Sequence, residues 1–183
     1  MSTNAIIESN QYLTFKLDQE VYALDISRVR EVLDFTDVTK VPRMPKFMRG
    51  VINLRGGVVP VVDLRLKFGL SATDKTVDTC IIIMEIAIEG ETTLLGALAD
   101  SVQEVMTMAP DQIEPPPRIG TRLNTEFIKG MGNRDDEFVI ILDIDKVFSS
   151  EELVVLQTTE DPSIMTEAIS QHAEEKVITE INV

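Results

Sequence analysis

The sequence is poor in the residues that enzymes and nucleic-acid-binding proteins use at their sites. Its 183 residues include one cysteine, one histidine and no tryptophan, and 31 acidic residues outnumber 17 basic ones. The net charge of −14 disfavours binding to nucleic acid or to an anionic membrane surface, because both require a basic face. No apolar run is long enough to span a bilayer, so we expect no direct membrane insertion.

With a single cysteine and a single histidine, the chain has few side chains suited to catalysis or metal binding. Cys80 lies in an apolar run, so we expect a small buried residue, and a lone cysteine excludes an internal disulfide. Such cysteine usage agrees with a cytoplasmic protein. His172 lies in an acidic C-terminal segment, which favours a solvated residue over a catalytic one. Since the sequence also has no cysteine–histidine cluster and no glycine-rich phosphate loop, we expect no enzyme activity, no metal and no cofactor.

Residues 47–68 predict a buried β-hairpin around which the chain is organised. Two runs rich in valine and isoleucine flank the segment Arg55-Gly56-Gly57, as expected of strands that are buried on both faces. The two glycines can adopt a positive φ in the turn without steric cost. The hairpin accounts for the apolar residues but leaves four polar side chains on a buried scaffold, namely Asn53, Arg55, Asp63 and Arg65.

The hairpin pattern occurs twice in the chain. Residues 127–148 repeat residues 47–68 at a constant offset of 80, and residues 102–105 repeat residues 29–32 at an offset of 73. The matching positions are Phe47 with Phe127, Gly50 with Gly130, Asn53 with Asn133, Asp63 with Asp143 and Phe68 with Phe148. Matches of several residue types at one offset indicate two copies of one β-unit.

The rest of the chain predicts short strands and then helices. Ser149 and Glu152 have the spacing of a capping box, which predicts a helix that starts there. Residues 150–183 carry eight acidic residues and one basic residue, so we interpret the C-terminal part as an appendage rather than as core. Strands are expected before each hairpin, at residues 12–17, 21–24, 79–88 and 92–98.

Two pairs of polar residues each allow a functional interpretation and a non-functional one. Asp63 and Asp143 could be paired acids, but their equivalent places in the two copies favour acceptance of hydrogen bonds at a strand end. Glu31 and Arg55 could form an ion pair, because arginine offers a planar fork to a carboxylate, or they could be unrelated surface charges. The spacing alone leaves both possibilities open.

Two motifs, at residues 50–56 and 59–65, together resemble those of the CheW-type chemotaxis coupling proteins. They read Gly-Val-Ile-Asn-Leu-Arg-Gly and Val-Pro-Val-Val-Asp-Leu-Arg, and Val-Arg-Glu-Val lies at the matching upstream place, residues 29–32. The resemblance covers about residues 10–157, and it extends to the regulatory domain of the CheA kinase and to CheV-type adaptors. Those proteins also carry a kinase or receiver domain, for which this chain has no room, so a stand-alone coupling protein is expected.

The resemblance implies a mainly β fold of two small five-stranded β-barrels, similar to Src-homology barrels. They would lie side by side about a pseudo-twofold axis, with short helical turns and a C-terminal helix. Residues 1–157 would form the CheW-like domain, with subdomains at about 10–70 and 79–148 and a crossing helix at about 150–157. Residues 158–183 would form an acidic extension.

The resemblance also implies a non-catalytic scaffold that couples transmembrane chemoreceptors to the CheA histidine kinase in bacterial chemotaxis. The expected partners are the regulatory domain of the kinase and the cytoplasmic tip of methyl-accepting chemoreceptors. The protein would be cytoplasmic and recruited to polar membrane receptor arrays. The motif positions that imply a receptor-binding groove between the barrels are Val29, Glu31, Gly50, Arg55 and Val105. Those with a motif or structural role are Asn53, Gly56, Asp63, Arg65, Asn133 and Asp143.

Two other functions remain open from the sequence. The same adaptor fold could serve a non-flagellar chemosensory pathway, such as pilus motility or development. A small-molecule-binding barrel is less favoured, because it would need a polar concave pocket and the chain has few reactive groups.

Overall fold

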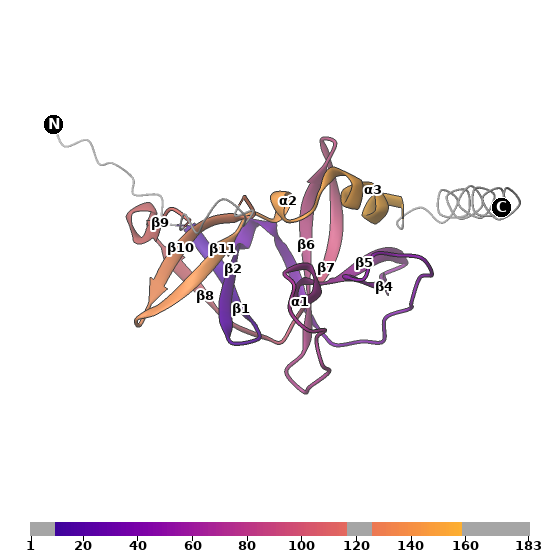
Figure 1. The fold of residues 1–183 in the computed structure, drawn as a ribbon, viewed down its shortest axis with the longest axis horizontal. Helices are drawn as coiled ribbons and strands as arrows, with labels where there is room; N and C mark the ends of the chain where they lie inside the picture. The colour runs from indigo at the N-terminus through magenta and orange to yellow at the C-terminus, as the bar shows by residue number, and fades with distance from the viewer. Residues whose placement is uncertain (1–9, 117–125, 159–183) are drawn as a thin grey trace, which may run out of the picture.

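The computed structural model describes residues 10–116 and 126–158, which form strands and a few short helices (Figure 1). The strands are β1 (Asn10–Leu17), β2 (Glu20–Asp25), β3 (Val29–Asp34), β4 (Met48–Leu54), β5 (Gly57–Asp63), β6 (Cys80–Ile88), β7 (Glu91–Ala99), β8 (Ser101–Met108), β9 (Ile113–Glu114), β10 (Ile128–Arg134) and β11 (Glu137–Leu142). The helical elements are η1 (Ile26–Arg28), α1 (Leu64–Lys67), η2 (Pro110–Gln112), α2 (Ile144–Val147) and α3 (Ser150–Thr158). The predicted mainly β fold is confirmed.

The strands form two mixed sheets. The six-stranded sheet has the order β8-β1-β2-β11-β10-β9, and the five-stranded sheet has the order β3-β6-β7-β5-β4. Each sheet is antiparallel except at one junction, where β11 runs parallel to β2 and β5 runs parallel to β7. The two sheets therefore share one internal arrangement, as two copies of one β-unit should.

The two copies of the repeat exchange their first hairpins. Strands β1 and β2 of the first copy pair with β8 and β11 of the second, and β6 and β7 of the second copy pair with β3 and β5 of the first. Figure 1 shows the indigo strands β1 and β2 among β8, β10 and β11. The expected subdomains at residues 10–70 and 79–148 therefore need correction, because each sheet draws strands from both ranges. The open edges of a hairpin can pair with either copy, and nothing in the sequence shows which.

A β-bulge lies at the same place in both copies of the central hairpin. The register shifts between Met48 and Gly50 in β4, and again just before Gly130 in β10. Gly50 has a φ of 139°, and a Cβ at this residue would lie 2.0 Å from the carbonyl oxygen of Thr39. Thr39 forms an isolated bridge to Val51, so glycine is required for this close approach of two backbones.

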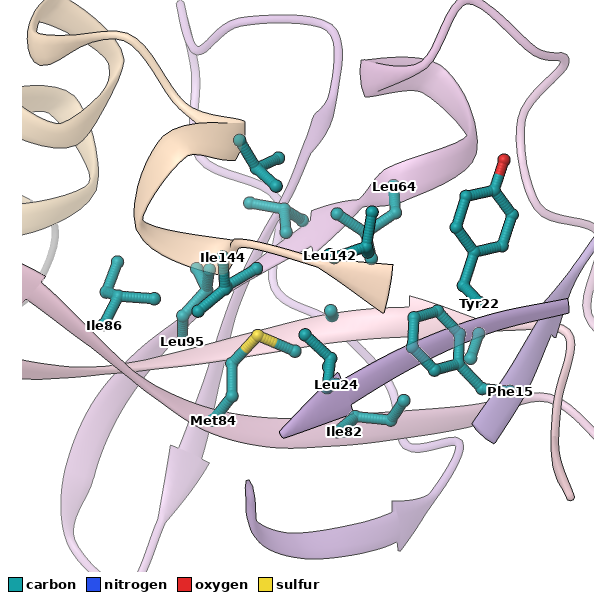
Figure 2. Close-up of a cluster of buried hydrophobic side chains, with 14 of the residues drawn as sticks. Phe15, Tyr22, Leu24, Leu64, Ile82, Met84, Ile86, Leu95, Leu142 and Ile144 are labelled. Carbon is teal, nitrogen blue, oxygen red and sulfur yellow. The ribbon is translucent and has the colours of Figure 1, made fainter. Parts of the chain in front are cut away.

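The main hydrophobic core joins the two sheets and receives side chains from both copies (Figure 2). Strand β6 explains how one apolar run serves two clusters. Its residues Ile82 and Met84 belong to the main core, whereas Ile81 and Ile83 belong to a smaller cluster within the five-stranded sheet. The run is buried on both faces and so lacks polar alternation. Cys80 lies in the main core, as the sequence predicted.

Side chains cap the start of several helical segments, and the sequence predicted the capping box before α3. Asp25 accepts a hydrogen bond from the Ser27 amide at the start of η1. The capping box before α3 is complete, because the Ser149 amide donates to Glu152 Oε1 at 2.9 Å and the Glu152 amide donates to Ser149 Oγ at 3.2 Å. Helix α3 confirms the expected C-terminal helix, while the acidic extension after Thr158 lies outside the described residues.

Candidate functional site

Glu31 and Arg55 form a bidentate ion pair on the five-stranded sheet. Arg55 Nη1 donates to Glu31 Oε1 at 2.7 Å, and Arg55 Nη2 donates to Glu31 Oε2 at 3.0 Å. Glu31 lies on β3 and Arg55 lies in the turn after β4, the two strands at opposite ends of the strand order. The pair therefore connects the two edges of a curled sheet. The structure decides between the two interpretations that the sequence left open.

The turn that carries Arg55 has an unusual backbone. Leu54 pairs with Gly57, so Arg55 and Gly56 form a two-residue loop with φ values of 50° and 85°. Positive φ at both central residues is typical of a type I′ turn, which matches the twist of the flanking strands. Glycine adopts this φ freely, whereas arginine does so at some cost. The side chain of Asn53 accepts a hydrogen bond from the Gly56 amide at 3.0 Å and closes the turn.

The ion pair is accessible to a partner. The side chain of Arg55 is 75% exposed and that of Glu31 is 25% exposed. The hydrogen bond to Glu31 raises the pKa of Arg55 above its ordinary value, so the guanidinium stays charged. Val32, the next residue on β3, is also exposed. Because successive side chains of a strand point to opposite faces, Val32 lies on the other face of β3 from Glu31. The site thus presents a fixed and accessible charge pair.

The other predicted groove residues occupy different places. Val29 begins β3 and packs against the main core, and Gly50 lies under the bridge between Thr39 and Val51. Val105 lies on β8, at the edge of the six-stranded sheet, and is exposed. The structure therefore joins Glu31 and Arg55 directly, while Val105 belongs to the other sheet.

A second ion pair, which the sequence-based prediction missed, lies on the six-stranded sheet. Arg134 Nη1 donates to Glu104 Oε1 at 2.6 Å, and Arg134 Nη2 donates to Gln103 Oε1 at 3.1 Å. Glu104 is the repeat counterpart of Glu31. The counterpart of Arg55 is Asp135, so the arginine of the second ion pair lies one residue before the matching position. In the sequence, only the repeat of Glu31 at Glu104 pointed to this second ion pair.

Asp63 and Arg65 form a buried hydrogen-bonded network, as predicted for a strand end. Asp63 is fully buried and accepts hydrogen bonds from the Arg65 amide and from both the amide and the hydroxyl of Thr73. Arg65 donates to Asp100 at 2.8 Å and to the backbone and hydroxyl of Ser71. Asp143 makes no side-chain cap to α2, and its carboxylate lies 3.9 Å from Lys146 Nζ, so the described part of the second copy shows no such network.

The described residues show no cluster suited to metal binding. No group of three or more histidine, cysteine, aspartate or glutamate side chains in residues 10–116 and 126–158 could hold a metal ion. Burial raises the pKa of the Cys80 thiol to about 11, so it remains protonated at neutral pH and is a poor nucleophile. In the same ranges, no helix is long and apolar enough to cross a membrane.

The model of the CheW-like domain family matches residues 11–152. The chain belongs to the CheW-like domain family. The chemotaxis protein CheW of Klebsiella aerogenes is 34% identical over 146 residues, which cover 80% of this chain and 86% of that protein. The CheW of Treponema pallidum is 32% identical over 150 residues, which cover 80% and 86%.

A solved structure supports the same relationship for this CheW-like chain. The scaffolding protein TtCheW from Thermoanaerobacter tengcongensis superposes with a TM-score of 0.70 at 36% identity, covering 83% of this chain and 96% of that protein. The similarity in sequence and fold identifies the chain as a coupling adaptor of chemotaxis signalling. The non-flagellar pathway and the small-molecule-binding barrel receive no support from these relatives.

Proposed function

We propose that this CheW-like adaptor is a non-catalytic scaffold that couples transmembrane chemoreceptors to the CheA histidine kinase. Its membership of a family of chemotaxis adaptors supports this role. Its partners would be the cytoplasmic tip of a methyl-accepting chemoreceptor and the regulatory domain of the kinase. It would act in the cytoplasm and be recruited to polar receptor arrays.

The Glu31–Arg55 pair is the observation that carries the proposed receptor site. An amphipathic helix binds by placing an apolar stripe against apolar surface, and charges at the edge set its orientation and exclude wrong partners. The pair offers one charge of each sign in a fixed geometry, and Leu33, two residues further along β3, shares the strand face of Glu31. In this proposal the receptor helix contacts the ion pair.

The remaining predicted groove residues complete the proposed surface. Val29 and Gly50 would shape the five-stranded side of the groove, and Val105 would contribute an apolar contact from β8 on the six-stranded side. The 48% exposure of Val105 leaves its side chain available for such a contact. Residues 158–183 would form an acidic appendage that this docking does not require.

Co-sedimentation with membranes that contain a chemoreceptor tests the site. We expect Glu31→Lys and Arg55→Glu each to weaken sedimentation on the order of tenfold or more, because each places two like charges together and leaves the partner misaligned. Arg134→Glu is the matched control, since it makes the same change in the second ion pair. If both Glu31→Lys and Arg55→Glu sediment like the parent, the assignment of the site is wrong. Adding CheA and measuring kinase activity then tests the coupling itself.

A further inference from the structure

The two copies of the central hairpin close their turns differently. In the first copy, Arg55 and Gly56 occupy the loop, and the Asn53 side chain accepts a hydrogen bond from the Gly56 amide. In the second copy, Asp135 and Asp136 occupy the loop with φ values of 48° and 66°. Among the described residues, the side chain of Asn133 makes no such bond. The same motif residue therefore has a turn-closing contact in one copy only.

The turn-closing contact lies in the copy whose turn residue carries the proposed receptor site. Arginine adopts positive φ less readily than the aspartates in the loop of the second copy, so Arg55 has the greater need of a contact that holds its turn. Apart from its chain neighbours, no atom lies within 4 Å of a Cβ built on Gly56, so no packing contact holds this residue. Beside the ion pair, two contacts hold the turn. One is the hydrogen bond from the Gly56 amide to the Asn53 side chain, and the other is the backbone pairing of Leu54 with Gly57.

The ion pair of the second copy has a different origin. Arg134 is the last residue of β10 and pairs with Glu137, so its backbone is held by the strand rather than by the loop. It reaches Glu104 although the Asn133 side chain makes no bond across its turn to another described residue. The comparison within one chain thus separates an arginine positioned by a strand from one positioned by a turn.

We propose that Asn53 is the positioning residue of the receptor site, a proposal that rests on the proposed function of Arg55. The Asn53 side chain accepts a hydrogen bond from the Gly56 amide and thereby holds Arg55 in the left-handed conformation. From this conformation the Arg55 guanidinium reaches both carboxylate oxygens of Glu31. Asn53 itself then need not touch the receptor. Its contribution to binding passes entirely through Arg55.

Binding of a soluble fragment containing a chemoreceptor cytoplasmic tip tests this role in the full-length protein. We expect Asn53→Ala to weaken binding about three- to tenfold, the range expected for loss of one hydrogen bond. Asn53→Asp keeps the acceptor oxygen and should remain within about twofold of the parent at a salt concentration that screens its added charge. Asn133→Ala, the matched control in the second copy, should bind like the parent.

A double-mutant cycle decides whether Asn53 acts through Arg55. In an Arg55→Ala background, Asn53→Ala should cause no further loss of binding. An equal loss in both backgrounds would overturn the proposal, because it would show an independent contact or a general structural effect. Unchanged binding of Asn53→Ala in the parent background would also overturn it.

A measurement without the receptor separates this inference from the proposed function. The NMR chemical shifts of Arg55 Cα and Cβ report its φ, and we expect them to leave the left-handed range in Asn53→Ala but not in Asn133→Ala. If Arg55→Ala binds the receptor fragment normally, the receptor site fails while the shifts still test the turn. If Arg55→Ala loses binding but Asn53→Ala leaves the shifts unchanged, the positioning role fails alone.

Discussion

The ring of Phe47 packs against the ring of Phe148, with the two centroids 5.7 Å apart. The rings of Phe68 and Phe127 also pack together, stacked with their centroids 5.0 Å apart. In the repeat, Phe47 corresponds to Phe127 and Phe68 to Phe148, so each pair joins the first phenylalanine of one copy to the last of the other. Contacts exchanged in this manner are what a twofold interface between identical subunits would show. The two copies within this one chain therefore pack together as the two subunits of a dimer would.

The exchange of hairpins predicts that the protein survives a cut between the two copies. Val77 is 99% exposed, so a protease site can be inserted there without loss of packing. After cleavage, we expect both fragments to elute together in a 1:1 ratio in size-exclusion chromatography, because four strand pairings cross the cut. The uncleaved protein with the insertion is the control. Two separate peaks under native conditions would contradict the exchanged topology.

The contact between Lys67 and Glu152 predicts a pH-dependent stability. Lys67 Nζ donates to both carboxylate oxygens of Glu152 at 2.7 Å and lies over the rings of Phe47 and Phe148. Burial acts to raise the pKa of Glu152, but hydrogen bonds from Lys67 and Ser149 outweigh it and lower the pKa. A lowered carboxylate pKa stabilises the fold above the pKa of the unfolded chain, and this stabilisation is lost as the pH falls through the folded value.

Lys67→Met tests this contact because it keeps most of the apolar stem. We expect a loss of about 1 kcal/mol in the free energy of unfolding at pH 7, measured by urea denaturation. The difference from the parent should shrink as the pH falls below about 4, where the carboxyl is protonated in the unfolded chain. Lys146→Met is the control, since Lys146 is more exposed and lies 3.9 Å from Asp143. An equal loss at pH 3 and pH 7 would assign the effect to packing instead.

Gly50→Ala is expected to cost far more stability than a substitution at a glycine that has open space around it. The added Cβ would collide with the Thr39 carbonyl at 2.0 Å, in addition to the strain of a φ of 139°. We expect a loss of roughly 3 kcal/mol or more in the free energy of unfolding. Gly69→Ala is the matched control, because Gly69 has a φ of 78° but open space around it. It should lose only about 1–2 kcal/mol from backbone strain. Similar losses in the two variants would show that the collision is relieved cheaply.

Cys80 is expected to resist thiol reagents while the protein is folded. Its side chain is 7% exposed, and burial raises its pKa to about 11. At pH 8 the thiol is therefore protonated as well as inaccessible, and labelling should follow global unfolding. Alkylation in urea, followed by mass spectrometry, provides the fully reactive reference. Rapid labelling in native buffer would show that the strand end at Cys80 opens locally.

The sequence by itself determined the local structure of this protein. The central hairpin, its repetition at residues 127–148 and the capping box at Ser149 and Glu152 were all readable. Each depends on residues close together along the chain, where turn chemistry, capping and apolar runs act directly. The buried role of Asp63 was readable too, because a carboxylate at the end of an apolar strand needs hydrogen-bond partners.

Only the tertiary structure decided which of these local units meet. In the folded chain, the first hairpin of each copy pairs with strands of the other copy, and Glu31 binds Arg55. The second ion pair uses Arg134 rather than the repeat counterpart of Arg55. Strand edges and charged side chains are locally interchangeable, so the choice among partners depends on which arrangement buries both sheets in one core. That choice is a property of the whole chain, and no short stretch of sequence contains it.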